Sequence, residues 1–101
     1  MAELNPIIQK IINVEPNTYI IFYVPECTYC QQALDLLRTS NVKYKGYNIH
    51  QINGSMQNLL EILKQNATLI GFDSSHRTKP IIFLNGKFLG GTRELSKQLH
   101  G

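Results

Sequence analysis

Only two cysteines occur in this chain of 101 residues, and they lie three positions apart in Cys27-Thr28-Tyr29-Cys30. Two thiols at this spacing can exchange disulfides or contribute to a metal site. The pair alone supplies too few ligands for zinc, and the histidines (His50, His76 and His100) lack the paired spacing of a zinc module. A bridge across so short a loop would constrain little of the unfolded chain, which disfavours a purely structural disulfide. Redox chemistry is therefore the favoured interpretation, with two incidental buried thiols as the alternative.

The first cysteine falls where a strand gives way to a helix. The run from Thr18 to Val24 is continuously β-branched and aromatic, which is typical of a strand buried on both faces. Pro25 ends this strand, and a helix is predicted from about Thr28 to Arg38. The unpaired N–H groups and the dipole of a helix start favour a thiolate, and cysteines there have pKa values lowered from about 8.5 to roughly 3.5–7.5. Cys30, one turn further in and more enclosed, is the natural resolving thiol.

Hydrophobic periodicity and turn residues predict the remaining elements. Asn5 should cap the first helix, Ser55 should cap the third, and Gly46 should mark a bulge in the second strand. Asn66 to Lys79 is predicted as a loop with room for a helical turn. In chain order the other predicted elements are a helix from Pro6 to about Val14, a strand from Val42 to Ile49, a helix from Ser55 to about Gln65, strands Ile81–Leu84 and Lys87–Leu89 joined by an Asn85-Gly86 turn, and a helix from about Thr92 to His100.

This element order, αβαβαββα, predicts an α/β fold. The strand–helix–strand unit around the cysteines should be right-handed with parallel strands, and the final hairpin adds antiparallel pairing. We therefore expect a four-stranded mixed sheet flanked by helices on both faces. The length suits a single domain, residues 1–101.

Composition limits the possible classes of function. Apolar residues make up 43% and charged residues 17% of the chain, which is an ordinary globular balance that argues against disorder. The net charge of +3 is not clustered, so we expect no nucleic-acid partner. No stretch approaches a membrane span, so we expect no membrane partner. The first nine residues resemble neither a secretory signal nor a transit peptide, so we expect a cytoplasmic protein.

Three motifs together resemble those of the glutaredoxin family, of the dithiol type, within the thioredoxin-like superfamily. Cys27-Thr28-Tyr29-Cys30 resembles the family's Cys-Pro-Tyr-Cys, and Arg77-Thr78-Lys79-Pro80 resembles its Arg-Thr-Val-Pro. Gly90-Gly91-Thr92-Arg93-Glu94-Leu95 resembles its Gly-Gly-x-x-Asp-Leu. The order of strands and helices also fits from about Thr18 to the C-terminus.

The resemblance implies a thioredoxin-like fold and a glutathione-dependent thiol–disulfide oxidoreductase. Its partners would be glutathione and either disulfide-containing or glutathionylated proteins, and we expect a monomer without a resident metal. Carried over, Cys27 is the nucleophile and Cys30 the resolving cysteine. Pro80 would be cis, and the backbone of Lys79 would pair with the backbone of glutathione. The full set of glutathione-binding residues implied by the family is Tyr29, Arg77, Thr78, Lys79, Pro80, Gly91, Thr92 and Glu94.

Each implied contact has a plausible chemistry and a plain structural alternative. Gly91, Thr92 and Glu94 would hold the γ-glutamyl end, because a helix start binds a carboxylate and an acid can take the ammonium. Arg77 could pair with the glycyl carboxylate. Without the family motifs, Thr92 reads as a simple N-cap, Arg77 as a solvated surface residue and Pro80 as a proline that starts a strand.

Three departures from the family pattern affect the prediction. Val24 stands where members usually carry Lys, and Glu26 directly precedes the first cysteine; both changes disfavour the thiolate. Thr28 replaces the motif proline, as in some relatives that hold a [2Fe-2S] cluster between two protomers. We therefore keep two alternatives, a glutathione-ligated cluster carrier and a thioredoxin-type electron donor driven by a flavoenzyme. The third departure is the Asn66–His76 stretch, which is longer than usual.

Overall fold

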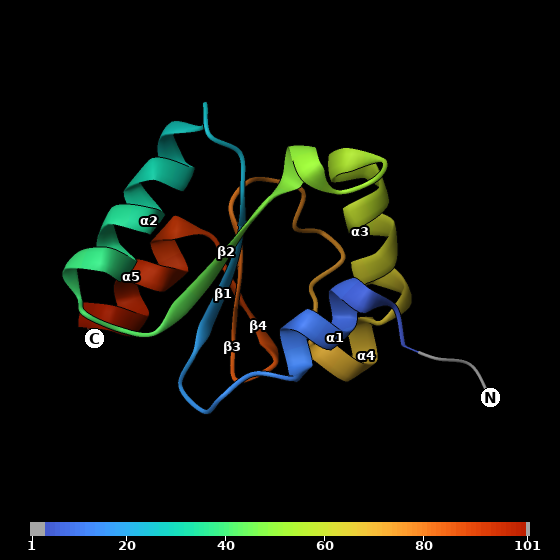
Figure 1. Cartoon of the computed structure of the whole chain (residues 1–101), viewed down its shortest axis with the longest axis horizontal. Helices are drawn as coiled ribbons and strands as arrows, with labels where there is room; N and C mark the ends of the chain where they lie inside the picture. Colours follow the sequence, from blue (N-terminus) through green and yellow to red (C-terminus); the bar gives the residue numbers. More distant parts are fainter. Residues whose placement is uncertain (1–3, 101) are drawn as a thin grey trace.

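The computed structural model describes residues 4–100 as one four-stranded sheet with helices on both sides (Figure 1). Residues 1–3 and 101, which the predicted domain 1–101 includes, lie outside the described residues. In chain order the elements are α1 (Pro6–Ile12), β1 (Tyr19–Tyr23), α2 (Thr28–Thr39), β2 (Tyr44–Asn48), the 3₁₀ helix η1 (Ile49–Gln51), α3 (Ser55–Gln65), α4 (Ala67–Ile70), β3 (Ile81–Leu84), β4 (Lys87–Gly90) and α5 (Thr92–His100).

The sheet has the strand order β2-β1-β3-β4. β1 and β2 run parallel, with Tyr19 opposite Tyr44, whereas β1–β3 and β3–β4 are antiparallel. The predicted four-stranded mixed sheet is therefore confirmed. Asn85 and Gly86 form the hairpin turn between β3 and β4, and both have the positive φ (54° and 77°) that this turn requires.

Two helical layers cover the sheet, with α2 and α5 on one face and α1, α3 and α4 on the other (Figure 1). Alternate residues of β1 serve the two layers: Ile20 and Phe22 pack against one, and Tyr19 and Ile21 against the other. The strand is buried nearly throughout, as its unbroken apolar sequence predicts. The α2–α5 layer packs through buried Ala33, Leu37, Ile82 and Leu95.

Two predicted helix starts have different outcomes. Asn5 caps α1 as expected, because its Oδ1 accepts the N–H of Ile7 at 2.8 Å. The Ser55 cap is wrong: the chain enters α3 through Gly54 (φ 80°) and Ser55 itself (φ 51°), and no side-chain capping bond forms. Instead, the amide of Asn58 donates to the carbonyl of Asn53 at 2.7 Å and ties the first turn to the preceding loop.

The bulge predicted at Gly46 is also wrong. Residues 19–23 pair with residues 44–48 in unbroken register, and the irregularity lies in the β3–β4 pairing, between Ile82 and Phe83. Gly46 makes room for the ring of Tyr23, which would lie 3.1 Å from a Cβ at that position. β2 ends at Asn48, earlier than predicted, because the Asn48 side chain accepts the N–H of His50 and starts η1.

The segment predicted as a loop with room for a helical turn contains α4, a helix of four residues. It ends at Gly71 in the left-handed conformation (φ 66°), and Ile70 and Phe72 are buried on either side of this turn. The segment then leads to the junction at Lys79–Pro80, where β3 begins. Among residues 4–100, no helix is both long enough and apolar enough to span a membrane.

Candidate active site

Cys27 occupies the N-cap position of α2, four positions after the end of the buried strand β1. Its Sγ accepts the backbone N–H of Cys30 at 3.2 Å, so the thiol takes the place that a Ser or Asp side chain usually fills. The same Sγ lies 3.9 Å from the carbonyl oxygen of Lys79, to which the thiol proton can be donated. Cys27 is partly exposed. An accessible sulfur that receives a helix N–H is arranged to act as a nucleophile.

Cys30 has the opposite environment, because its side chain is fully buried in the core. Burial, followed by the hydrogen bond with the Cys27 side chain, raises the pKa of the Cys30 thiol from 9.0 to about 12. At neutral pH this thiol therefore stays protonated. The two cysteines have free thiols and differ in exposure in the direction that the sequence predicts.

A groove of about 410 Å³ lies beside this sulfur, and we call it the Pro80 groove. The Lys79–Pro80 peptide bond in its wall is cis, as the resemblance implies. Seven of the eight residues predicted to bind glutathione are in its lining, and Arg77, which is exposed, is not. The lining consists of Tyr29, His76, Thr78, Lys79, Pro80, Gly91, Thr92, Arg93 and Glu94.

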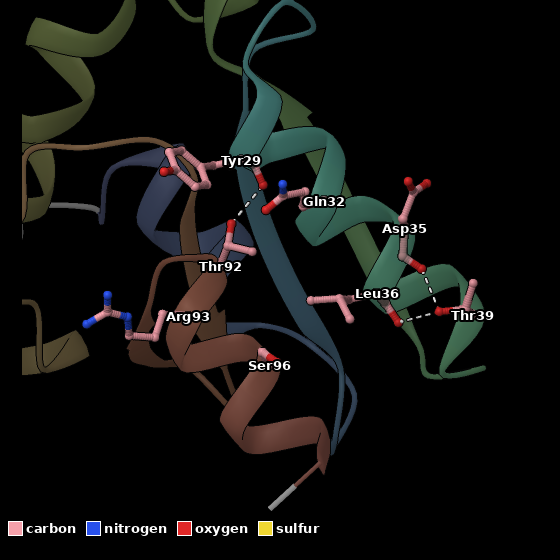
Figure 2. Close-up of a pocket in the computed structure, with 8 residues that line it drawn as sticks. All are labelled: Tyr29, Gln32, Asp35, Leu36, Thr39, Thr92, Arg93 and Ser96. Atoms are coloured by element: carbon pink, nitrogen blue, oxygen red, sulfur yellow. Dashed lines mark hydrogen bonds between the residues drawn. The ribbon is translucent and has the colours of Figure 1, made fainter.

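The start of α5 forms one wall of the Pro80 groove, which two hydrogen bonds and a glycine turn shape. Glu94 Oε1 accepts the N–H of Gly91 at 2.8 Å, and this bond lowers the pKa of the Glu94 carboxyl below 4.5. The hydroxyl of Thr92 donates to the carbonyl of Tyr29 at 2.7 Å and joins α5 to α2 (Figure 2). Gly90 has a φ of 139°, and a Cβ there would come within 2.6 Å of the Glu94 side chain. This glycine is therefore required by the turn.

Sequence reasoning missed two residues of the groove, His76 and Arg93. The ring of His76 packs edge-on against Phe72 and Phe88, with centroids 6.5 Å and 5.1 Å away, and Nε2 lies 3.4 Å from the Pro80 carbonyl oxygen. His76 directly precedes the Arg77–Pro80 motif, and Arg93 lies within the Gly90–Leu95 motif. This proximity to the motifs was the signal in the sequence that could have placed them in the groove. The family resemblance pointed to the neighbouring Arg77 instead.

The acidic residue next to the nucleophile has a partner that the sequence did not reveal. Glu26 Oε1 lies 2.5 Å from Nε2 of His50, which is carried by η1. The hydrogen bond with His50 lowers the pKa of the Glu26 carboxyl. The Glu26 carboxylate next to the nucleophile is therefore engaged by the His50 ring. Val24, at the other departure from the family pattern, is buried in the core and contributes no charge.

Comparison with known proteins decides the family. The model of the family described as Glutaredoxin matches residues 19–89, which is more than half of the chain. The chain belongs to the glutaredoxin family. A probable glutaredoxin from Acanthamoeba polyphaga mimivirus is 53% identical over 96 residues, which cover 95% of this chain and 91% of that protein.

Solved glutaredoxin structures have the same fold. The solution structure of the dithiolic glutaredoxin 2-C-Grx1 from Trypanosoma brucei brucei has a TM-score of 0.70 and 25% identity, covering 95% of this chain and 88% of the other. The crystal structure of a buckwheat glutaredoxin–glutathione complex has a TM-score of 0.73 and 20% identity, and the match covers 93% of this chain and 76% of the buckwheat chain. The predicted thioredoxin-like α/β fold is therefore confirmed.

Membership of the glutaredoxin family makes this chain a thiol–disulfide oxidoreductase. Cys27 and Cys30 are the two cysteines of the sequence. Within the described range 4–100, no cluster of three or more His, Cys, Asp or Glu side chains is suited to hold a metal ion.

Proposed function

We propose that this glutaredoxin is a glutathione-dependent oxidoreductase that reduces protein disulfides and mixed disulfides between glutathione and proteins. Cys27 is the nucleophile and Cys30 the resolving thiol. The single observation that carries this assignment is the contrast between the two sulfurs. Sγ of Cys27 is accessible and receives a helix N–H at 3.2 Å, whereas Cys30 is buried with a pKa raised to about 12.

The exchange reaction follows from this contrast. The Cys27 thiolate attacks the glutathione sulfur of a mixed disulfide; a new S–S bond forms, the old one breaks, and the substrate thiolate leaves and takes a proton. A second glutathione thiolate then attacks the Cys27–glutathione disulfide and releases oxidised glutathione. With a protein disulfide, Cys27 bonds to one substrate sulfur and the other substrate sulfur leaves as a thiolate. Cys30 then attacks Cys27, the bond between Cys27 and the substrate breaks, and the Cys30 proton passes to the departing substrate thiolate. Two glutathione molecules reduce the resulting Cys27–Cys30 disulfide and leave as oxidised glutathione.

The Pro80 groove is the proposed site for the glutathione half of the substrate. Its volume of about 410 Å³ lies within the roughly 300–1,000 Å³ usual for ligand sites. Lys79 offers backbone groups beside the sulfur, and the Glu94 carboxylate can take the γ-glutamyl ammonium with the oxygen that Gly91 does not use. The buckwheat glutaredoxin that shares this fold has been solved as a glutathione complex, which supports the same ligand here.

A coupled assay tests the proposal. The substrate is the mixed disulfide of glutathione and 2-mercaptoethanol, with NADPH consumption driven either by glutathione plus glutathione reductase or by thioredoxin reductase alone. We expect turnover only in the first arm. The thioredoxin-type alternative would instead give turnover in the second arm without glutathione.

Two matched serine variants test the assigned roles. Cys27→Ser should abolish turnover, because the attacking sulfur is gone. Cys30→Ser should retain it, because glutathione can resolve the Cys27 adduct. Equal losses in both variants would contradict the assignment.

A further inference from the structure

A second and larger groove lies between α2 and α5 (Figure 2), and we call it the α2–α5 groove. Its volume is about 550 Å³, again within the usual range for ligand sites. It shares Tyr29, Thr92 and Arg93 with the Pro80 groove, so the two hollows have a common wall. Its other lining residues are Gln32, Asp35, Leu36, Thr39 and Ser96.

The lining combines apolar surface with a few polar groups, as peptide-binding surfaces do. Tyr29 is 65% exposed, which is unusual for a large aromatic residue, and its ring is accessible on the wall that the two grooves share. Leu36 and the small side chain of Ser96 extend the groove away from Tyr29 (Figure 2). Gln32 is exposed along the same side and offers an amide for hydrogen bonds.

The charge of the groove is concentrated at its end near the active site. Arg93 makes no ion pair with any residue from 4 to 100. It belongs to the wall that the two grooves share, and in Figure 2 its guanidinium points away from α2. Asp35, the acid of the lining, already pairs with Arg38. In Figure 2 the Asp35 carboxylate points away from Arg93. Glu94, next to Arg93 in the chain, is held by the Gly91 N–H and makes no ion pair with it. An acidic side chain that reaches the shared wall would therefore meet a guanidinium that no described ion pair engages.

We propose that the α2–α5 groove binds an extended segment of the substrate protein next to its disulfide-bonded cysteine, with an acidic side chain directed to Arg93. This inference rests on the proposed function. When the glutathione half of a mixed disulfide occupies the Pro80 groove, the protein half must extend across an adjoining surface. The α2–α5 groove adjoins it through Tyr29, Thr92 and Arg93, and its exposed ring and free cation suit a polypeptide.

The test compares a substrate that fills the groove with one that cannot reach it. Serum albumin glutathionylated on its free cysteine, and an eight-residue glutathionylated peptide with Glu beside the cysteine, are the long substrates. The mixed disulfide of glutathione and 2-mercaptoethanol is the short one. Ser96→Trp and Gln32→Trp fill the groove from its two helices, and Gln98→Trp places the same bulk on α5 outside it.

We expect both groove variants to lower kcat/KM for the long substrates by about fivefold or more, while the short substrate changes less than twofold. Gln98→Trp should leave both unchanged. Thermal unfolding of each variant shows whether it is folded. If Ser96→Trp is unstable, Gln32→Trp still tests the groove, because Gln32 is exposed and its replacement does not disturb the core. Replacing the Glu of the peptide by Lys should lower kcat/KM of the wild-type protein for the peptide, but should not lower kcat/KM of the Arg93→Glu variant.

Unchanged activity on the long substrates, or equal losses on both substrate classes, would overturn the groove assignment. So would sedimentation that shows a dimer which Ser96→Trp dissociates, because the occupant would then be a second copy of this chain. Failure of the proposed function looks different: the wild type would turn over neither the long nor the short substrate with glutathione.

Discussion

Unfolding the chain in guanidinium chloride should expose a thiol that the folded protein keeps unreactive. Burial and the Cys27 hydrogen bond raise the pKa of Cys30 from 9.0 to about 12. At neutral pH the difference makes its thiolate fraction about a thousandfold smaller than in the unfolded chain. Because only the thiolate reacts with iodoacetamide, alkylation of Cys30 should slow by at least this factor on folding.

The assay is brief alkylation at pH 7, with label well below one equivalent so that modified Cys27 does not change its neighbour. Both cysteines lie on one tryptic peptide, so fragmentation mass spectrometry must locate the label. In the folded protein we expect the label on Cys27 alone, and in guanidinium chloride on both residues. Labelling of Cys30 in the folded protein at a rate near that of the unfolded chain would refute the reasoning.

Three further predictions concern stability and the wall formed by α5. Thr92→Val removes the donor to the Tyr29 carbonyl and should lower the free energy of unfolding by about 0.5–1.5 kcal/mol in urea titrations, and no loss would contradict the bond. Glu94→Ala leaves the Gly91 N–H without its partner and should have a similar effect, whereas Glu94→Gln, which keeps an acceptor, should have a smaller one. From about pH 9 upward the unfolded chain releases the Cys30 proton while the folded chain retains it, so the free energy of unfolding should fall as the pH rises. In Cys30→Ser this fall should be shallower. Equal slopes of unfolding free energy against pH in the two proteins would contradict the raised pKa.

Much of the fold follows from local sequence patterns. The apolar run of β1 and the Asn85-Gly86 turn each encode one conformation strongly, and the structure agrees with both. The errors arise where backbone conformation or a contact in the folded chain decides, and residue type alone does not show it. Gly46 accommodates the ring of Tyr23 rather than a bulge, and Ser55 enters α3 with a positive φ. Tyr23 lies 23 positions from Gly46, so the sequence around the glycine gave no sign of the contact.

The candidate site shows the same division between local and distant information. The strand-to-helix junction that exposes Cys27 is a local feature and was predictable from periodicity. The Glu26–His50 pair joins residues 24 positions apart, so spacing alone gave no signal for it. The α2–α5 groove depends on how two helices pack against the sheet, and Arg93 and Ser96 acquire their places only through that packing.

The central claim is that Cys27 attacks and Cys30 resolves, and trapping the intermediate tests it most directly. Each serine variant is incubated with a small excess of oxidised glutathione, and its intact mass is measured. Cys30→Ser should accumulate one glutathione on Cys27, while Cys27→Ser should remain unmodified because its remaining thiol is buried and protonated. Rapid glutathionylation of Cys27→Ser, or none of Cys30→Ser, would contradict the account.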